Sequence, residues 1–553
     1  MSELKSRQIF SNIQIVILLS ILVSISIIFR IVVFPFELPI YQDGEVYFWY
    51  ANDMSILNDF PGWGKDRFPN TLWPTLLSGF FSIVDSNNFI DYMTLQRIVT
   101  VGISIVTVIP IFFLCKKFVD PLYAVIGSSL LLFDPRLIQS SLNGLTEPLF
   151  LLLGIISILL FLSKRMIWIF TSFGILALFA LTRYEGLVLI IPFSIMFFWR
   201  YRSRKYLIRY LICITIFLTI IFSVDFLKNE TIDNSTFVYL FAGSTNIAKG
   251  NVELQNGCDI GDETTNCISK NTKTFFGIFY STISNIIKYY GWMLVPLFLV
   301  FIPIGLFKFL KNRNFEKWTI IICMIFMLLP AFYAFSRDFQ EMRYLYIQIP
   351  LLCVIASLSI KFFSEKINRE KIVITLFLSC IILTGGIFYY DQVYVDNKQE
   401  KEYFEIAKKI NSTMKVTNEI FPADKYIRSA KIAELSEFPV LRNSFELFSL
   451  KVISIDETCN NIEHSLCFKN KISIDEKETL REFLEFAKEN DLGHLVIDDD
   501  GDDVKFLYDI FHNENNFKFL EKIYDSTNYG FEYHVKFYKI DYEIVEEYYG
   551  YEL

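Results

Sequence analysis

The feature of this 553-residue sequence that most limits its fold is a series of long apolar runs. Eleven stretches reach or approach the roughly 20 residues that a helix needs to cross a bilayer. A mean hydropathy of +0.38 and 57 Phe residues exclude an ordinary soluble domain of this length. We therefore expect a polytopic α-helical membrane protein. The predicted crossings are 9–33, 97–115, 121–138, 146–162, 166–182, 186–200, 207–226, 291–310, 318–335, 344–361 and 372–390.

Positive charge gathers in every second loop between these runs. Residues 34–96, on the other side, contain eight acidic residues against Lys65 and Arg67. Because positively charged loops stay in the cytoplasm, we expect a cytoplasmic N-terminus and an extracytoplasmic C-terminal region. The runs 166–182 and 186–200 are interpreted as two short crossings, since one bent span would break this alternation. The basic loops are Lys116-Lys117, Lys164-Arg165, 200–209, 308–317 and 361–371.

Composition divides the chain near residue 390. Residues 391–553 contain 35 Asp and Glu against 20 Lys and Arg, whereas residues 1–390 contain 32 bases against 25 acids. The acidic part alternates helix-like stretches with strand-like stretches. We predict a transmembrane domain at 1–390, with outer loops 34–96 and 227–290, followed by a soluble extracytoplasmic α/β or α+β domain. Nothing in the charge pattern indicates nucleic-acid binding. The first run is too long for a signal peptide and lacks a small-residue cleavage site, so we expect it to be a membrane anchor.

Two pairs of cysteines lie on the predicted outer side, where oxidation is favoured. Cys258 and Cys267 fall in the second outer loop, and Cys459 and Cys467 fall in the C-terminal domain, each pair at a local spacing compatible with a disulfide. The acidic run at 498–503 lacks the spacing of an EF-hand. We expect it to be a solvated turn, and we predict no metal or other cofactor.

Ionisable residues at the ends of spans are costly unless they are paired or hydrated, so each is a functional candidate. Here they gather at the predicted outer ends. Any one of them could simply face water or pair with a neighbour, but the one-sided set favours a shared polar site. The aromatic residues around Asp43 could stack on a sugar or form an interfacial belt. The charged set is Asp43, Glu45, Asp134, Arg136, Glu147, Arg183, Glu185, Arg337, Asp338, Glu341 and Arg343.

These motifs together resemble the GT-C superfamily of integral-membrane glycosyltransferases. The first outer loop has Asp43, Tyr47, Ala51 and Met54 at the spacing found in the branch that contains protein O-mannosyltransferases and lipid A aminoarabinose transferases. Later segments are similar as well: "FPNTLWPTLLSGFF", "LNGLTEPLFLLL", "ALTRYEGLVLIIPF" and "EMRYLYIQIP". The resemblance covers residues 9 to about 390. The C-terminal domain looks like that of archaeal members. One departure is Gly44, which stands where the family often has an acidic residue.

The resemblance implies a glycosyltransferase that moves a sugar, such as mannose, from a polyprenyl (dolichyl) phosphate to a hydroxyl on the extracytoplasmic face, with inversion. The acceptor would be a glycan, a protein or a lipid. Asp43 is the predicted catalytic base. The other predicted roles are a second acid for Glu45, Asp134 or Glu147, donor-phosphate binding for Arg343, Arg183 and Arg136, and sugar or acceptor contact for Tyr47, Trp49, Glu185, Glu341 and Tyr344.

Three other readings stay open at this point. A transporter or flippase would place charges near the middle of the bilayer. A catalytically inactive scaffold would keep the fold without the chemistry. An oligosaccharyltransferase is disfavoured, because the Trp-Trp-Asp-Tyr-Gly motif of that family is absent from residues 391–553 and no Asp-x-Asp occurs in the first outer loop.

Overall fold

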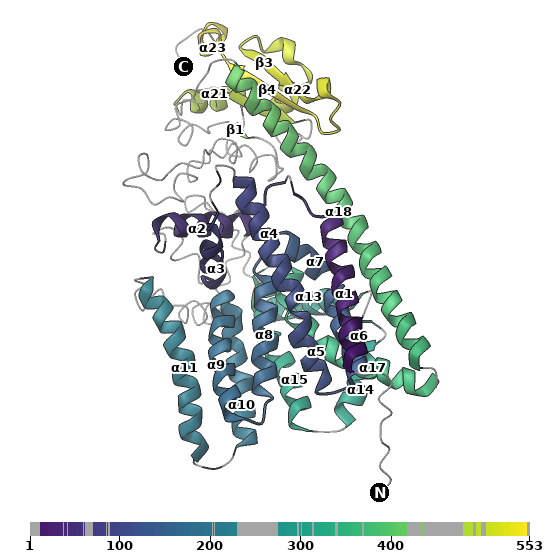
Figure 1. Cartoon of the computed structure of the whole chain (residues 1–553). Helices are drawn as coiled ribbons and strands as arrows, with labels where there is room; N and C mark the ends of the chain where they lie inside the picture. The colour runs from purple at the N-terminus through teal and green to yellow at the C-terminus, as the bar shows by residue number, and fades with distance from the viewer. Residues whose placement is uncertain are drawn as a thin grey trace. The chain divides into compact units, whose positions relative to one another are not determined.

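A computed structural model describes most of the chain, which forms two compact units (Figure 1). One unit comprises Met1–Phe34, Lys65–Gly79 and Leu95–Gln392, and the other comprises Pro35–Gly64, Phe80–Thr94 and Val393–Leu553. The residues that the structure describes are 12–36, 38–40, 43–58, 60, 70–84, 86, 89–201, 203, 205–228, 275–295, 298–299, 301–311, 314–337, 341–367, 370–416, 433–434, 479–489, 494–498 and 505–549.

The first unit is helical. Five of its described segments are long and apolar enough to cross a membrane, and a sixth is the pair α6 and α7, bent by 52°. The protein is therefore an integral membrane protein. The helices that lie wholly or largely in this unit are α1 (Asn12–Val32), α3 (Leu72–Phe81), α4 (Phe89–Val106), α5 (Val108–Lys116), α6 (Pro121–Leu132), α7 (Pro135–Leu142), α8 (Glu147–Phe161), α9 (Met166–Thr182), η1 (Tyr184–Leu189), α10 (Ile190–Arg200), α11 (Lys205–Leu227), α13 (Phe275–Leu294), α14 (Phe301–Lys311), α15 (Phe315–Phe326), α16 (Leu329–Ser336), η3 (Met342–Leu345) and α17 (Gln348–Ile367), with the first half of α18 (Glu370–Val416).

Every predicted crossing contains helix among its described residues, but several of these helices are short. The five long segments are Asn12–Val32, Ile90–Lys116, Tyr206–Leu227, Phe315–Ser336 and Gln348–Ile367. The predicted crossing at 291–310 contains the end of α13, which stops at Leu294, and most of α14, which begins at Phe301. Pro296 lies between them in the sequence, and proline lacks the backbone N–H that a continuous helix uses.

The helices α8, α9 and α10 run back and forth rather than forming one bent span. Arg183, which follows α9, donates to Glu147 at the start of α8. Arg200, at the end of α10, donates 2.7 Å to the carbonyl of Ser163, just after α8 ends. The two contacts lie at opposite ends of α8, a helix about 22 Å long at 1.5 Å per residue. Consequently α9 and α10 are separate and antiparallel, as the alternation of loops predicts.

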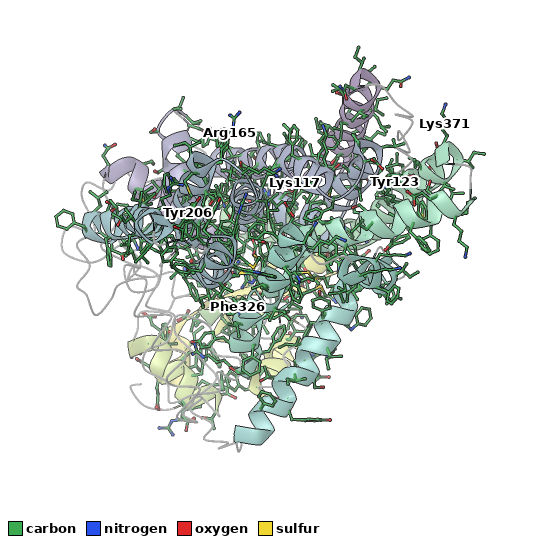
Figure 2. The ribbon with its side chains drawn as sticks, turned by 90° about the horizontal axis from the view of Figure 1, so that it is seen from below. Lys117, Tyr123, Arg165, Tyr206, Phe326 and Lys371 are labelled. Atoms are coloured by element: carbon green, nitrogen blue, oxygen red, sulfur yellow. The ribbon has the colours of Figure 1, made fainter. Side chains whose placement is uncertain are left out.

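Basic residues from several predicted cytoplasmic loops meet at the Arg200 end of the first unit. Figure 2 looks onto this end and labels Lys117, Arg165 and Lys371. Lys361 pairs with Asp120 at 2.7 Å. Burial lowers the pKa of Lys117. The charge of Glu316 raises this pKa, whereas the charges of Arg200 and Lys164 lower it further. The end that carries Arg183 is thus opposite a basic end.

In the second unit, the described part of the first outer loop includes a helix, α2 (Asp43–Leu57). Phe48 is buried and packs against Phe81 with ring centroids 5.6 Å apart, and Phe81 contacts Tyr92 at 5.5 Å. The backbone N–H of Ile40 donates to the sulfur of Met93. An aromatic cluster therefore holds α2 within this unit.

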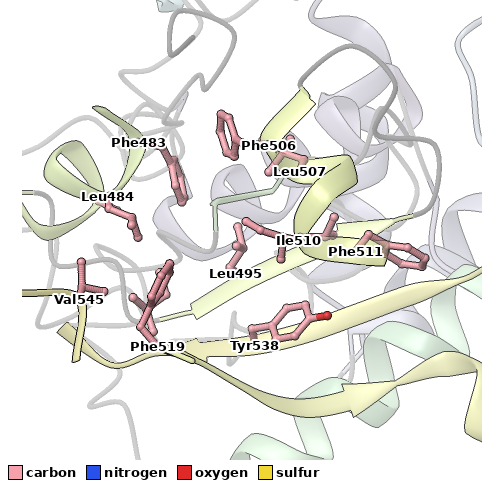
Figure 3. Packing of buried hydrophobic residues seen from close by; sticks show 13 residues of the cluster. Phe483, Leu484, Leu495, Phe506, Leu507, Ile510, Phe511, Phe519, Tyr538 and Val545 are labelled. Carbon is pink, nitrogen blue, oxygen red and sulfur yellow. The ribbon is translucent and has the colours of Figure 1, made fainter. Parts of the chain in front are cut away.

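The C-terminal part of the second unit is a four-stranded sheet with helices. The strand order is β1-β2-β4-β3, with β1 parallel to β2 and the other pairs antiparallel. The apolar faces of the helices close over the sheet around Leu495, Ile510 and Phe519 (Figure 3). The expected alternation of helix-like and strand-like stretches is seen in α21, β2 and β4, among the described residues of this part. The elements are β1 (Ala433–Glu434), α21 (Leu480–Glu489), β2 (His494–Asp498), α22 (Lys505–His512), η5 (Glu514–Asn516), β3 (Leu520–Asp525), η6 (Ser526–Tyr529), β4 (Val535–Ile540) and α23 (Tyr542–Tyr549).

The predicted border at residue 390 falls inside a helix. Helix α18 continues for 47 residues from Glu370 to Val416, and the two units divide it between Gln392 and Val393. Cys258, Cys267, Cys459 and Cys467 lie outside the described residues, as do most of the loop 227–290 and the run 499–503.

Candidate functional site

At the end of the first unit opposite the basic residues, Arg183 lies between two carboxylates. It donates 2.7 Å from Nη1 to Glu147 Oε1 and 2.9 Å from Nη2 to Glu185 Oε1. All three residues are buried. The other carboxylate oxygens, Glu147 Oε2 and Glu185 Oε2, are buried and have no hydrogen-bond partner in the described part of the chain. The cluster thus combines one positive and two negative formal charges with two unused acceptor oxygens.

The local sequence explains why these side chains meet. Glu147 begins α8 and is followed by Pro148, which suits the first turn of a helix. A carboxylate there also interacts favourably with the helix dipole. Arg183 and Glu185 flank the turn from α9 into η1, and Gly186 permits that turn. A Cβ on Gly186 would lie 2.7 Å from the Phe179 ring and 3.0 Å from the Ala180 backbone. The glycine of the "TRYEG" motif therefore has a steric cause.

Aromatic rings complete the surroundings of Arg183. Its guanidinium carbon lies 5.7 Å from the centre of the Tyr344 ring and 6.0 Å from that of Phe150, within range of cation–π attraction. Burial and then the Glu185 carboxylate raise the pKa of the Tyr184 hydroxyl. The Tyr184 phenol therefore stays protonated at neutral pH and can donate a hydrogen bond.

Asp134 and Arg136 form a second pair, which joins α7 to the end of α13. Asp134 caps α7 by accepting from the backbone N–H of Arg136 at 3.0 Å, and its carboxylate also accepts from the Arg136 guanidinium through both oxygens, at 3.1 Å each. The guanidinium also donates to the carbonyls of Trp292, Met293 and Val295. Its donors are therefore largely used within the fold, and a phosphate would have to displace these carbonyls.

Arg343 is the most accessible of the three arginines predicted to bind the donor phosphate. Its side chain is 24% exposed, against 10% for Arg183 and 14% for Arg136. It pairs with Glu341, whose own side chain is 47% exposed. A half-exposed carboxylate is an easily displaced partner, because an exposed ion pair contributes little. Asp338 lies outside the described residues, whereas Arg337 donates to the Tyr333 hydroxyl at 3.1 Å.

In the second unit, helix α2 gives the Asp43 motif a geometric meaning. Asp43 is the first residue of the helix, and residues spaced by three or four positions share one helical face. Tyr47, Ala51 and Met54 follow at that spacing and are buried. Glu45 is two positions on, which turns it about 200° around the helix from Asp43. Glu45 instead accepts from Trp49 Nε1 at 3.4 Å, so the two carboxylates lie on opposite faces.

Sequence reasoning missed two residues near these groups, Asn70 and Tyr346. Asn70 Oδ1 accepts from the backbone N–H of Tyr184 at 2.9 Å and so links the start of α3 to η1. The backbone N–H of Tyr346, the residue after η3, donates to the carbonyl of Arg343 at 3.1 Å. Tyr346 follows Arg343 by three positions, and that spacing is the signal that could have identified it.

The described residues of this site offer hydrogen-bond acceptors, hydrogen-bond donors and paired charges. Among the described residues, no group of three or more His, Cys, Asp or Glu side chains is placed to hold a metal ion. The carboxylate oxygens can accept from hydroxyl groups, and Arg343 can pair with an anion.

Comparisons with known proteins identify the fold. No protein-family model and no curated protein sequence matches the chain. Among solved structures, the oligosaccharyltransferase of Archaeoglobus fulgidus in complex with zinc and sulfate is 13% identical, with a TM-score of 0.50 over 89% of this chain and 71% of that one. ArnT of Cupriavidus metallidurans bound to undecaprenyl phosphate is 9% identical, with a TM-score of 0.46 over 94% and 97%. The chain is therefore similar in fold to the Archaeoglobus fulgidus structure over most of its length.

Proposed function

We propose that this protein is a glycosyltransferase that moves a sugar from a polyprenyl phosphate to an acceptor hydroxyl at the extracytoplasmic surface. The observation that carries the proposal is the buried cluster of Arg183, Glu147 and Glu185, with accessible Arg343, in a GT-C-like fold. Two unused carboxylate oxygens suit a ligand that donates hydrogen bonds, and Arg343 suits an anion. A glycosyl phosphate has both properties.

The reaction would be a single displacement. The acceptor oxygen attacks the anomeric carbon and forms the new glycosidic bond, while the bond from that carbon to the phosphate oxygen breaks. The electron pair leaves with the phosphate, whose charge Arg343 would stabilise. The acceptor proton would pass to Asp43 as general base. Attack opposite the leaving group inverts the anomeric centre.

The geometry supports a different role for Arg183 from that of Arg343. Both terminal nitrogens of Arg183 already bind carboxylates. Breaking a buried pair leaves an uncompensated charge, at a cost of about 3–5 kcal/mol. Arg183 therefore fits a residue that positions Glu147 and Glu185, and Arg343 is the better candidate for the donor phosphate.

The topology we propose has eleven crossings with the basic end of the first unit in the cytoplasm. Positively charged loops are retained there, and Lys117, Lys164 and Arg200 meet at that end. The Arg183 end would then face outward, together with Asp43 and the C-terminal domain. This orientation matches a donor sugar that is used outside the cell.

A transporter is the rival from another class, and the distribution of charge disfavours it. No Asp, Glu, Lys or Arg falls in the middle third of any of the five long candidate spans. Among the buried charges of those spans, Arg30 and Asp225 lie in the last turn of their helices, and Arg97 lies in the first third of the span Ile90–Lys116. Transporters that bind substrates near the midplane need polar groups at that depth.

The test uses membranes that contain the full-length protein and labelled polyprenyl-phosphate sugars. We expect transfer of label to an endogenous acceptor, and accumulation of one glycosyl polyprenyl phosphate in a strain that lacks the protein. Mass spectrometry of the lipid fraction would identify that donor and its sugar. Movement of intact lipid across the bilayer without any transfer would favour the transporter, and absence of both would favour the inactive scaffold.

A further inference from the structure

The first turn of α3 is held against the turn that carries Glu185. Asn70, two residues before the helix, accepts from the backbone N–H of Tyr184 at 2.9 Å. Thr71 is the neighbour of Asn70, and Glu185 is the neighbour of Tyr184. Because consecutive Cα atoms are 3.8 Å apart, this hydrogen bond keeps the Cα atoms of Thr71 and Glu185 within about 15 Å.

This turn contains two buried donors that the fold does not use. Thr71 and Trp73 are fully buried, and neither Thr71 Oγ1 nor Trp73 Nε1 has a hydrogen-bond partner in the described part of the chain. By contrast, the hydroxyl of Thr75 in the same helix donates 2.7 Å to the carbonyl of Thr71. Buried polar groups without partners are rare in folded proteins, so each needs an explanation.

The polar groups without partners on either side of the Asn70–Tyr184 hydrogen bond are of two kinds, hydrogen-bond donors and hydrogen-bond acceptors. Trp73 Nε1 can only donate and Thr71 Oγ1 can donate or accept, whereas Glu147 Oε2 and Glu185 Oε2 can only accept when ionised. A ligand that satisfies all of them must both accept and donate. A phosphate has no donor to offer at neutral pH and would be repelled by the carboxylates. A sugar ring, whose hydroxyl groups each accept and donate, fits the set.

We propose that Thr71 and Trp73 form a sugar-recognition subsite, in which they donate to hydroxyl oxygens of the donor sugar while Glu147 and Glu185 accept from its hydroxyl groups. The inference rests on the proposed function, since it assigns the part of that site that reads the sugar rather than the phosphate or the lipid. Trp73 would act as a binding residue for the ring, and Asn70 as the residue that positions its helix turn.

The test compares binding of glycosylated and bare lipid. Purified full-length protein would be titrated with mannosyl-, glucosyl- and unglycosylated dolichyl phosphate in detergent. Trp73→Phe keeps an aromatic ring and removes the N–H, and Thr71→Val keeps the shape and removes the hydroxyl. We expect each variant to bind the preferred glycosylated lipid about ten-fold more weakly, the loss of one or two hydrogen bonds. Binding of bare dolichyl phosphate should change less than two-fold.

Thermal unfolding of the free protein separates recognition from a structural role. Because Thr71 and Trp73 satisfy no partner within the described chain, neither substitution should lower the unfolding temperature. Thr100→Val is the contrast, because the Thr100 hydroxyl bonds the carbonyls of Gln96, Arg97 and Ser141. Trp318→Phe, on α15 near the basic end, is the matched control for an indole and should leave binding of both lipids unchanged.

Each other outcome contradicts the subsite. Equal losses for glycosylated and bare lipid would mean that the turn supports the phosphate or the fold, and unchanged affinities would mean that ordered water alone satisfies these donors. If the wild-type protein binds bare and glycosylated lipid equally, the subsite fails while a lipid-phosphate site survives. If the wild-type protein binds none of the three lipids and transfers no sugar, the proposed function itself fails, and the subsite with it.

Discussion

The guanidinium of Arg183 donates a 2.7 Å hydrogen bond to Glu147, a residue 36 positions earlier in the chain. This contact ties the end of α9 to the start of α8. The other oxygen of Glu147 has no hydrogen-bond partner among the described residues. The relationship makes Arg183 a support for carboxylates rather than a free cation, and it leads to the first prediction.

Replacing Arg183 by Met should destabilise the protein, because two buried carboxylates lose their counter-charge. The expected loss is about 3–5 kcal/mol in the free energy of unfolding. Adding Glu147→Gln and Glu185→Gln to the same chain should recover part of it, since the buried negative charges are then removed. Thermal unfolding in detergent would measure both steps. Additive losses in the triple variant would contradict the cluster.

Gly186→Ala should destabilise the turn that carries Glu185. The new Cβ would contact the Phe179 ring at 2.7 Å, and overpacking of this kind costs about 1–3 kcal/mol. Gly102→Ala, in the interior of α4, is the matched control, because nothing lies within 4 Å of its Cβ position. That control should be neutral or up to about 1 kcal/mol more stable. If both substitutions changed the free energy of unfolding by the same amount, contact of the new Cβ with Phe179 could not explain why the motif contains glycine.

The C-terminal sheet should lose protection in acid through Asp525 and Glu514. Burial alone would raise both pKa values, but hydrogen bonds from Thr527 and Lys522 to Asp525, and from Lys522 and Tyr538 to Glu514, lower them. A lowered acid pKa contributes stability above the unfolded value near 4, and the contribution is lost as pH falls through the folded pKa. Hydrogen exchange of β3 in the full-length protein should show this loss.

Lys522 provides the check on that pH dependence. Its hydrogen bond to Glu514 raises the pKa of its amine, so this contribution is present below the unfolded value near 10.4 and lost as pH rises above it. Lys522→Gln should therefore lower the protection of β3 at pH 6 and flatten its acid dependence. An unchanged profile in this variant would show that other groups control the sheet.

The proposed orientation predicts opposite labelling of the two ends. In a background without native cysteines, Lys398→Cys on α18 should react with a membrane-impermeant maleimide on intact cells. Arg165→Cys, at the basic end, should react only after permeabilisation. The reverse pattern would invert the topology and place the Arg183 cluster in the cytoplasm.

Hydrophobic pattern and charge predicted much of this fold, because lipid forces backbone groups to pair within a helix and so makes apolar runs helical. The helices α8, α9 and α10 follow that logic, whereas the strands β2 and β4 were indicated by their strand-like residue pattern. The break between α13 and α14 and the continuity of α18 could not be predicted in this way, since local composition does not determine where a helix ends. The candidate site divides in the same way. Its charged residues could be found from their positions at span ends, but the pairing of Arg183 with Glu147 depends on packing of distant segments.

The role of Asn70, Thr71 and Trp73 could not be predicted from the sequence for a related reason. Their types are ordinary for the start of an apolar helix, and only burial without partners marks Thr71 and Trp73. Likewise, the sequence places Asp43 and Glu45 together, whereas the 100° turn per residue of α2 separates them.

The most direct test of the central claim is sugar transfer by the Asp43→Asn variant in membranes supplied with a labelled polyprenyl-phosphate sugar. The amide keeps the shape of the side chain but cannot take up the proton of the acceptor hydroxyl. We therefore predict a loss of at least about 100-fold in the rate of sugar transfer, the usual contribution of a general base. Glu45→Gln, on the opposite face of the same helix, should retain most of its activity. Undiminished transfer by Asp43→Asn would contradict the account.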